Sequence, residues 1–341
     1  MKKLTILGMG HIGTYVFDTL GQDPNFEVMG YDLKFGHDLS KDSLLLNEII
    51  KDSDGVLAST PFFLNKKIAQ LCNEHGTDYF DLTESVDVTN YVRTLTNAKF
   101  VTQCGLAPGM VNIIANHMAT QYDEVQDIEI RVGALPVDAN NHMGYYRTWS
   151  TEGLINEYIH PCPAVKNGML TTVDPLTQSE VVNLGGTLLE AMTTSGGLGS
   201  LAETWQGRAQ NVNYKTLRYP GHWTLMRFLK DDLGLASNFD TFVDLFNTHI
   251  PVTTQDCVYI MIRVSGWKDG NLHTDIYSKV IDYHDDVTAI QLTTGHGVMA
   301  VLDSWQKGDM DHLTGWVRVE DLDYNSVWKS IYSTCYHNKG A

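Results

Sequence analysis

A short apolar run that ends in a glycine-rich turn constrains this chain most. Residues 4–13 read Leu-Thr-Ile-Leu-Gly-Met-Gly-His-Ile-Gly, so Gly8, Gly10 and Gly13 have the spacing G-x-G-x-x-G. In a strand–turn–helix unit, the first glycine permits a tight turn and the second lets the backbone approach a pyrophosphate. The third lets the helix pack on the strand, and the start of that helix attracts phosphates. The run therefore predicts a dinucleotide-binding unit, with a purely structural glycine turn as the alternative.

The next apolar run supports this interpretation. Residues 26–31 lead into Asp32, close to the offset of about 20 residues at which a carboxylate meets the ribose hydroxyls of an adenosine. The same carboxylate would repel a 2′-phosphate, so NAD is expected in preference to NADP. Lys34 lies nearby and is the main reservation about that preference.

Strand and helix patterns then alternate along the first third of the chain. Strands are expected at 55–58, 79–82 and 100–102, and helices at 11–20, 44–50, 61–74, 86–95 and 110–118. Such alternation predicts a Rossmann-type, doubly wound parallel sheet of the α/β class, whose ligands bind beyond the carboxyl ends of the strands. The residues expected to bind the cofactor are Gly8, Gly10, His11, Ile12, Gly13, Asp32, Ser59, Thr60, Pro61, Thr83, Leu106, Ala107, Pro108 and Gly109.

From about residue 125 the pattern changes to alternating, half-buried strands. These are expected at 128–132, 258–264 and 273–278, with a hairpin turn at 266–270 between the last two. A mixed or antiparallel sheet covered by helices is the simplest account. The predicted domains are an NAD(P)-binding domain at 1–120, an inserted α/β substrate and oligomerisation domain at 121–304, and a segment at about 305–341 that packs back on the first domain.

Composition narrows the possible partners. The 341 residues carry 41 acidic and 24 basic side chains, a formal net charge of −17 that disfavours nucleic acid and anionic lipid surfaces. The five cysteines have no C-x-x-C spacing, and the first strand leaves no room for a signal peptide, so a cytoplasmic protein without a disulfide framework is expected. Asp282, His284, Asp285 and Asp286 carry side chains of the kinds that ligate metal ions. These residues are instead expected to form a turn and to cap the start of the following helix, so no metal site is expected.

Three motifs resemble the saccharopine dehydrogenase family, nearest to its L-lysine 6-dehydrogenase-like branch. They are Gly-Leu-Ala-Pro-Gly-Met at 105–110, Thr-Trp-Ser-Thr-Glu-Gly at 148–153 followed by Glu157-Tyr158, and Tyr-Lys-Thr-Leu-Arg-Tyr-Pro-Gly-His at 214–222. The resemblance implies a Rossmann domain, an inserted substrate domain, and reversible oxidation of a carbon–nitrogen bond in an amino acid or polyamine precursor. The chain departs from relatives that make or split saccharopine at residues 193–210, which leaves the substrate open.

The resemblance also suggests which residues contact the substrate. It places the segment at Trp149 and Ser150, together with Arg218, at the substrate, and the planar guanidinium of Arg218 can hold a carboxylate through two hydrogen bonds. For Arg218, the alternative is a surface salt bridge. His222 is a candidate for proton transfer near neutral pH, and the alternative is a structural histidine whose hydrogen bonds are satisfied at the start of a helix. The catalytic candidates are His222 and Glu203, and the substrate-binding candidates are Trp149, Ser150, Glu152, Tyr214, Arg218 and Tyr219.

These observations favour an NAD(P)-dependent oxidoreductase that acts on the C–N bond of an amino acid. Oxidative deamination of L-lysine at its side-chain amine is the leading hypothesis, and a saccharopine- or carboxynorspermidine-type reductase or dehydrogenase is the alternative. A non-catalytic NAD(H)-binding redox sensor is the alternative from another class. A homo-oligomer, either dimer or tetramer, is expected from the resemblance and from the aromatic and apolar content of the second domain. The general base is not identified by the sequence.

Overall fold

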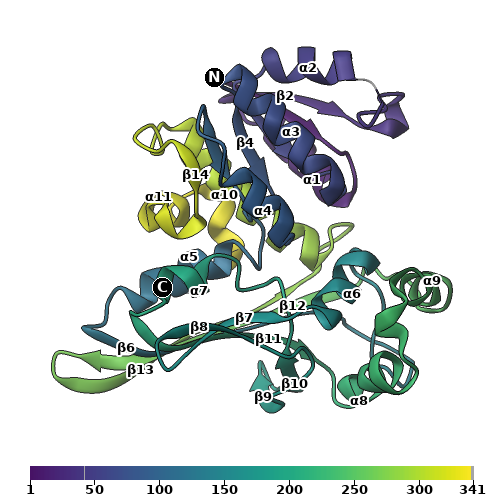
Figure 1. Ribbon diagram of the computed structural model, residues 1–341, viewed down its shortest axis with the longest axis vertical. Helices are drawn as coiled ribbons and strands as arrows, with labels where there is room; N and C mark the ends of the chain where they lie inside the picture. The colour runs from purple at the N-terminus through teal and green to yellow at the C-terminus, as the bar shows by residue number, and fades with distance from the viewer. Residues whose placement is uncertain (42, 339–341) are drawn as a thin grey trace. The chain divides into compact units, whose positions relative to one another are not determined.

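The computed structural model describes residues 1–41 and 43–338 and divides into two compact units (Figure 1). The first unit contains Met1–Ile113 and Thr294–His337, and the second contains Ile114–Thr293. The chain leaves the first unit within helix α5 (Met110–Ala119) and returns within helix α10 (Ala289–Gln306). The boundary expected near residue 304 therefore falls inside a helix.

The first unit is built on a parallel sheet with the strand order β14-β5-β4-β3-β1-β2. Because β2 and β3 both pair with β1, the strand order reverses there, and such a switch point is where doubly wound folds bind their ligands. The segment after α10 contributes β14, which pairs in parallel with β5. The strands are β1 (Lys2–Leu7), β2 (Phe26–Tyr31), β3 (Gly55–Ala58), β4 (Asp78–Asp81), β5 (Lys99–Val101) and β14 (Gly315–Val317).

Helices cover both faces of this sheet. On one face, α2, α3 and α4 pack into a core with β1, β3, β4 and β5. On the other face, the Trp305 ring of α10 lies edge-on to Phe80 with 5.3 Å between centroids, and a Cβ at Gly55 would lie 2.7 Å from that ring. The helical segments are α1 (His11–Leu20), η1 (Leu33–Phe35), α2 (Ser43–Lys51), α3 (Phe62–His75), α4 (Val86–Val92), η4 (Val319–Asp321), α11 (Tyr324–Trp328) and η5 (Ile331–Tyr336).

The second unit is built on a mixed sheet with the order β13-β12-β6-β11-β10-β9, and β7 joins β11 to β8. Strands β6 and β11 run parallel, and the other pairs are antiparallel. Figure 1 shows the long strands of this sheet side by side. The strands are β6 (Glu124–Pro136), β7 (Cys162–Lys166), β8 (Met169–Val173), β9 (Glu180–Leu184), β10 (Thr187–Thr193), β11 (Ala209–Arg218), β12 (Asp256–Lys268) and β13 (Asn271–Asp282).

The β9–β10 hairpin curls over one face of this sheet. A Cβ at Gly185, in the hairpin turn, would lie 2.8 Å from Val280 of β13, and the hydroxyls of Thr187 and Tyr259 are 3.2 Å apart. The curl encloses an apolar core that includes Leu135, Leu189, Leu217 and Cys257.

A separate helical core forms beyond the sheet, where aromatic rings of α6, α8 and α9 pack together. The helical segments of this unit are α6 (Thr151–Ile159), α7 (Leu201–Trp205), α8 (His222–Arg227), η2 (Phe228–Asp232), η3 (Leu235–Ser237) and α9 (Phe239–His249). Within the described ranges, no helix combines the length and apolar character needed to cross a bilayer. All five cysteines are free thiols.

Two local expectations were wrong. The hairpin turn is only Asp269–Gly270, with φ of 52° and 73°, so the strands on either side are longer than predicted. Gly266 lies instead inside β12 at a bulge against β6, where a Cβ would be 2.1 Å from the carbonyl oxygen of Glu124. That glycine marks a close backbone approach within the sheet rather than a turn.

The acids before α10 do not cap that helix. The Thr288 hydroxyl accepts a hydrogen bond from the Gln291 amide at 3.1 Å, and the carboxylate of Asp256, from β12, accepts the amides of Ala289 and Ile290 at 2.6 and 3.1 Å. The exposed Asp285 pairs with His284. A carboxylate from a distant strand satisfies the helix start, which no local pattern could indicate.

Candidate active site

The glycine turn after β1 lies against the end of β3. Gly8 has φ +93°, and a Cβ there would lie 2.4 Å from the carbonyl oxygen of Ser59. A Cβ at Gly13 would lie 2.0 Å from the carbonyl oxygen of Gly8. Gly10 differs, because a Cβ there would meet no atom within 4 Å. Two glycines are thus required by packing within the fold, whereas the third leaves open space at the start of α1.

The start of α1 has the properties of a phosphate site. Gly10 is its N-cap and supplies no side-chain hydrogen bond to the first turn. The amides and dipole of an N-terminus without such a cap suit an anion. His11 is exposed and Ile12 half-buried in this turn.

Asp32 connects the glycine turn to the segment after β2. One carboxylate oxygen accepts the Met9 amide at 2.7 Å, and the other accepts the Lys34 amide at 2.9 Å. Each oxygen keeps further acceptor capacity, so ribose hydroxyls can still donate to it. The Lys34 ammonium donates to the Met9 carbonyl and lies 3.3 Å from the Thr14 hydroxyl. A cation therefore stands beside the carboxylate that would select NAD.

The remaining cofactor candidates occupy loops at the same edge of the sheet. The Thr60 hydroxyl donates to Asn65 at 3.0 Å, and Pro61 is the N-cap residue of α3. The buried Thr83 donates its amide to Asp81 at 3.1 Å. Burial raises the pKa of Asp81 to about 6, against the opposing effect of the backbone amides that it accepts. Asp81 also accepts the Gln103 amide at 3.0 Å, which joins the loops after β4 and β5.

The loop between β5 and α5 is closed on itself. Gly109 has φ +140°, and a Cβ there would lie 2.1 Å from the carbonyl oxygen of Gly105. The Asn112 side chain accepts the Gly109 amide at 3.0 Å. Between these glycines, Leu106 and Pro108 are buried and Ala107 is half-buried. All fourteen predicted cofactor residues therefore lie in the first unit, at or just beyond the carboxyl ends of β1 to β5.

In the second unit, Arg218 ends β11 and is 2% exposed. Its Nε donates to the Tyr158 hydroxyl at 2.9 Å, and its Nη1 donates to the Leu217 carbonyl at 2.9 Å. Glu190 stands opposite it on β10, but that carboxylate accepts the Gly221 amide at 3.2 Å instead. Arg218 forms no ion pair with the residues that the structure describes. The buried, charged guanidinium of Arg218 therefore has only neutral hydrogen-bond partners.

Aromatic rings surround this guanidinium. Its central carbon lies 5.3 Å from the ring centroid of Tyr145 and 5.9 Å from those of Tyr158 and Trp223. Such contacts stabilise the charge without neutralising it. The site thus keeps its positive charge available for an anionic group.

His222, the first residue of α8, belongs to the same cluster and is fully buried. Its Nδ1 donates to the Met143 carbonyl at 3.1 Å, and its Nε2 accepts from the Tyr158 hydroxyl at 3.3 Å. Burial, reinforced by the charge of Arg218, lowers the pKa of His222 to about 3. His222 is therefore better described as a neutral histidine whose two ring nitrogens are both hydrogen-bonded and which positions the Tyr158 hydroxyl. The alternative role, a proton carrier near neutral pH, is disfavoured.

Sequence reasoning missed the carboxyl group of Glu157 as a site residue. Glu157 lies on α6, is 6% exposed, and receives no hydrogen bond on its carboxylate from the described residues. Burial raises the pKa of Glu157 to about 8, although the charge of Arg218 opposes that rise. The helical period was the available signal, because Glu157 falls on the buried stripe of Leu154, Ile155 and Tyr158.

Three predicted substrate residues lie at the start of α6. Ser150 is its N-cap and accepts the Gly153 amide at 3.1 Å, while its hydroxyl donates to the exposed Glu152 at 3.0 Å. The Trp149 ring packs on Gly153, where a Cβ would lie 2.4 Å away. These contacts organise the helix start, and none of them reaches Arg218.

The other predicted residues are spread over different surfaces. Tyr214 is buried against Gly197, and the Tyr219 hydroxyl donates to the Pro136 carbonyl at 2.9 Å. Tyr219 packs on the core enclosed by the curled sheet, on the face opposite Arg218. Glu203 is exposed on α7. The structure therefore brings together Arg218 and His222, and it does not add Tyr219 or Glu203 to their contacts.

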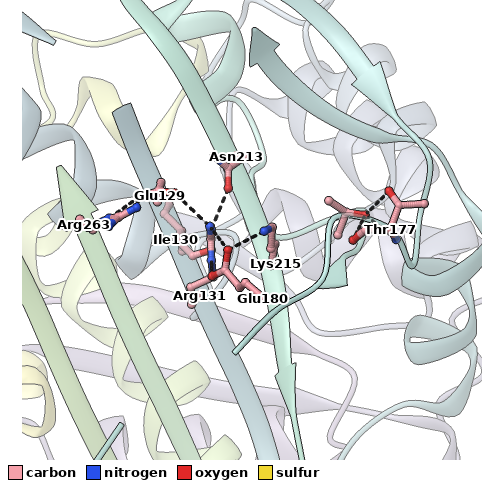
Figure 2. Close-up of polar contacts among 9 residues, drawn as sticks. Glu129, Ile130, Arg131, Thr177, Glu180, Asn213, Lys215 and Arg263 are labelled. Carbon is pink, nitrogen blue, oxygen red and sulfur yellow. Dashed lines mark hydrogen bonds and ion pairs between the residues drawn. The ribbon is translucent and has the colours of Figure 1, made fainter. Parts of the chain in front are cut away.

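Lys215 belongs to a charged network on the face of the sheet that also carries Tyr219, opposite Arg218. Figure 2 shows Arg131 between Glu129 and Glu180, with Lys215 reaching Glu180 from the neighbouring strand. The Lys215 Nζ lies 2.5 Å from Glu180, and Arg263 pairs with Glu129. Burial alone would raise the pKa of Glu180, but its bonds to Arg131 and Lys215 lower it below the ordinary value. These cations are committed to internal carboxylates.

Among the residues that the structure describes, no three or more His, Cys, Asp or Glu side chains gather into a group that could hold a metal ion. Comparison with known proteins points to one family. The family model described as "Saccharopine dehydrogenase C-terminal domain" matches residues 105–334. Mouse mitochondrial alpha-aminoadipic semialdehyde synthase is 21% identical over 196 residues, which cover 50% of this chain and 21% of that protein. The chain thus spans about a fifth of that curated relative.

Solved structures share the fold. Saccharopine dehydrogenase (L-Glu forming) from Saccharomyces cerevisiae superposes with a TM-score of 0.75 at 15% identity and 96% coverage of both chains. Homospermidine synthase from Legionella pneumophila, in complex with NAD, gives a TM-score of 0.67 at 12% identity, covering 98% of this chain and 89% of that one. Since the matching family model covers more than half of the residues, this chain belongs to the saccharopine dehydrogenase family.

Proposed function

We propose that this protein is a nicotinamide-dependent oxidoreductase that acts on the carbon–nitrogen bond of an amino acid. The first unit supplies a dinucleotide cradle, with open space at Gly10, an N-terminus without a side-chain cap, and a carboxylate at Asp32. The chain's family membership and the solved homospermidine synthase with NAD support a cofactor of this kind. That cofactor supplies the acceptor for hydride when it is bound.

The observation that carries the substrate class is the guanidinium of Arg218. Three cations are buried in the described part of the second unit, and two of them, Arg131 and Lys215, pair with Glu180. Arg218 has only neutral hydrogen-bond partners. A buried guanidinium whose hydrogen-bond partners are all neutral is suited to bind the carboxylate of an amino acid through charge-assisted hydrogen bonds.

L-Lysine oxidised at its side-chain amine is the specific substrate that we propose. Lysine brings one carboxylate, which matches the single buried cation without an internal carboxylate partner. A saccharopine-like secondary amine brings additional carboxylates, each of which needs a further cation on burial. Arg147 is not such a cation in this cluster, because it donates to the Ile250 carbonyl at 2.8 Å and to Asn247 at 2.6 Å.

Glu157 is the base that we propose for the substrate amine. Hydride can leave the adjacent carbon only when the nitrogen has a lone pair, so an ammonium must first lose a proton. Burial raises the pKa of Glu157 to about 8, so its carboxylate, once ionised, is basic enough to take that proton, and the step is expected to be fastest at mildly alkaline pH. Arg218 then holds the carboxylate end while Glu157 takes the proton.

The direct test is to follow the absorbance of the reduced nicotinamide while NAD or NADP is offered with a panel of amino acids and polyamine precursors. Reduction of NAD with L-lysine, and weaker reduction with NADP, is expected. Activity with saccharopine or carboxynorspermidine and none with lysine would establish the alternative enzyme. NAD(H) binding without turnover of any substrate would instead support a redox sensor.

A further inference from the structure

The proposed reaction makes no use of Asp81, whose carboxylate is buried where three loops of the first unit meet. Asp81 is the last residue of β4, and β4 lies between β3 and β5 in the parallel sheet. Its side chain is fully buried. The loops after these three strands carry the predicted cofactor residues from Ser59 to Gly109. A side chain at this point can therefore act on the cofactor site through the loops.

The carboxylate of Asp81 is hydrogen-bonded to each of these loops. Its Oδ1 accepts the Thr83 amide at 3.1 Å and the Gln103 amide at 3.0 Å, from the loops after β4 and β5. The Asn65 side chain, in the first turn of α3, also hydrogen-bonds to Asp81. The Oδ1 of Asn65 accepts the Thr60 hydroxyl at 3.0 Å, which connects the loop after β3. One side chain thus joins three loops that are far apart in the sequence.

The loop after β5 is held to Asp81 at two points. Gln103 is buried and has a φ of +66°, a left-handed conformation that is strained for a residue with a side chain. The amide of the next residue, Cys104, donates to the Asp81 carbonyl oxygen at 2.9 Å. The turn at Gln103 directs the chain into the glycine-bounded loop at 105–109. The contacts with Asp81 therefore fix where that loop begins.

Every hydrogen-bond partner of Asp81 among the described residues is neutral. Burial raises the pKa of Asp81 to about 6, and the groups that donate to it limit the rise. The titratable groups that face it are Tyr79 on β4 and Cys104, and Cys72 of α3 interacts with Tyr79. Burial raises the pKa of all three far above neutrality, so Asp81 alone among these groups changes charge near neutral pH. Its bonds to the backbone amides are charge-assisted, and hence stronger, when it is ionised.

We propose that Asp81 is a positioning residue of the dinucleotide site, whose ionised carboxylate holds the loops after β3, β4 and β5 in the arrangement that binds the cofactor. Protonation weakens these bonds and lowers the affinity for the dinucleotide. Asp81 acts through the loops and does not itself touch the cofactor. This inference rests on the dinucleotide binding in the proposed function and does not depend on which amino acid is oxidised.

Calorimetric titration with NAD, or with NADP where it binds more tightly, tests this role on three variants at about pH 8. Asp81→Ala removes every side-chain bond to the loops and should raise the Kd roughly 10- to 100-fold. Asp81→Asn keeps an acceptor oxygen without the charge and should raise it roughly 3- to 10-fold. Tyr79→Phe is the matched control, because the Tyr79 hydroxyl donates to the same carboxylate at 2.8 Å from within β4 and holds no loop. It should lower the melting temperature and leave the Kd within about twofold.

The pH dependence of the Kd is a readout that a purely structural role would not move. The wild-type Kd should rise as the pH falls through the pKa of about 6, because the form that binds the dinucleotide better is lost. At about pH 5 it should approach the Kd of Asp81→Asn, whose neutral side chain resembles a protonated aspartate. The ratio between the two proteins should therefore shrink as the pH falls.

Three results would overturn the proposal. They are a folded Asp81→Ala variant with the wild-type Kd, a Tyr79→Phe variant that loses as much affinity as Asp81→Asn, and a ratio between Asp81→Asn and the wild type that is the same at both pH values. If Asp81→Ala does not fold, the comparison of Asp81→Asn with the wild type decides. A wild-type chain that shows the expected pH profile of binding, yet reduces the cofactor with no amino acid, would contradict the proposed function and leave the role of Asp81 supported. A wild-type chain that binds neither dinucleotide would overturn both.

Discussion

Lys215 and Arg218 lie three residues apart on β11 and project from opposite faces of the same sheet. Lys215 is neutralised by Glu180, whereas Arg218 donates to the Tyr158 hydroxyl and keeps its charge among aromatic rings. One cation therefore fastens the curled hairpin to the sheet, and the other remains available to a ligand.

Replacing Arg218 by alanine should lower kcat/KM on the best amino acid by roughly 30- to 1,000-fold. This corresponds to about 2 to 4 kcal/mol for lost charged hydrogen bonds and an unpaired substrate carboxylate. Arg218→Lys should recover only part of the loss, since an ammonium lacks the planar fork. Steady-state kinetics and the affinity for NAD would be measured together. Wild-type kcat/KM in a folded Arg218→Ala variant would remove Arg218 from the substrate site.

Glu157 should make the protein less stable as the pH rises. The folded state holds a proton on Glu157 up to a pKa of about 8, whereas the unfolded chain releases it near the ordinary value of 4.5. The free energy of unfolding should therefore fall by up to about 1.4 kcal/mol per pH unit between these values. Glu157→Gln should flatten this dependence in urea titrations, while Glu152→Gln, an exposed control on the same helix, should not. An unchanged slope in Glu157→Gln would contradict the assignment.

Gly10→Ala and Gly13→Ala should separate ligand binding from folding. The Cβ at position 10 meets open space, so thermal stability should change by no more than about 0.5 kcal/mol while NAD affinity falls roughly tenfold or more. The Cβ at position 13 would lie 2.0 Å from a backbone oxygen, so that variant should lose about 2 kcal/mol or more of stability. Calorimetry and NAD titration on both variants check this. Equal NAD affinity in Gly10→Ala and the wild type would show that the open space does not receive the cofactor.

Asp32→Ala should reduce the preference for NAD over NADP by roughly 10- to 100-fold, as expected for the loss of charged hydrogen bonds to the ribose. Asp32→Asn retains one acceptor oxygen and provides the matched control. The ratio of kcat/KM for the two cofactors measures the effect. A wild-type enzyme that prefers NADP would point to Lys34 as the residue that determines the preference.

Local patterns in the sequence were sufficient to predict the first unit. Helix α1 begins at His11 and ends at Leu20 as expected, and the parallel sheet follows from strands that alternate with helices. The glycine spacing and the offset to Asp32 also lie within one local supersecondary unit. These features depend on backbone torsion angles and on alternation of apolar residues, which neighbouring residues largely determine.

The second unit depended more on tertiary contacts. Strands β7 to β10 went unpredicted, since short, partly exposed strands carry little periodicity. Asp256 caps α10 from another strand, and Tyr219, adjacent to Arg218, packs on the opposite face of the sheet.

The sequence alone thus determined the dinucleotide-binding type of the first unit and the family to which the chain belongs. Only the tertiary structure decided which charges are neutralised. Arg131 and Lys215 meet Glu180, whereas Arg218 meets the hydroxyl of Tyr158, 60 positions away in the chain. The physical reason is that a side chain's chemistry is set by burial and by its nearest partners. Those partners are chosen by strand pairing and helix packing over long separations, which no local pattern encodes.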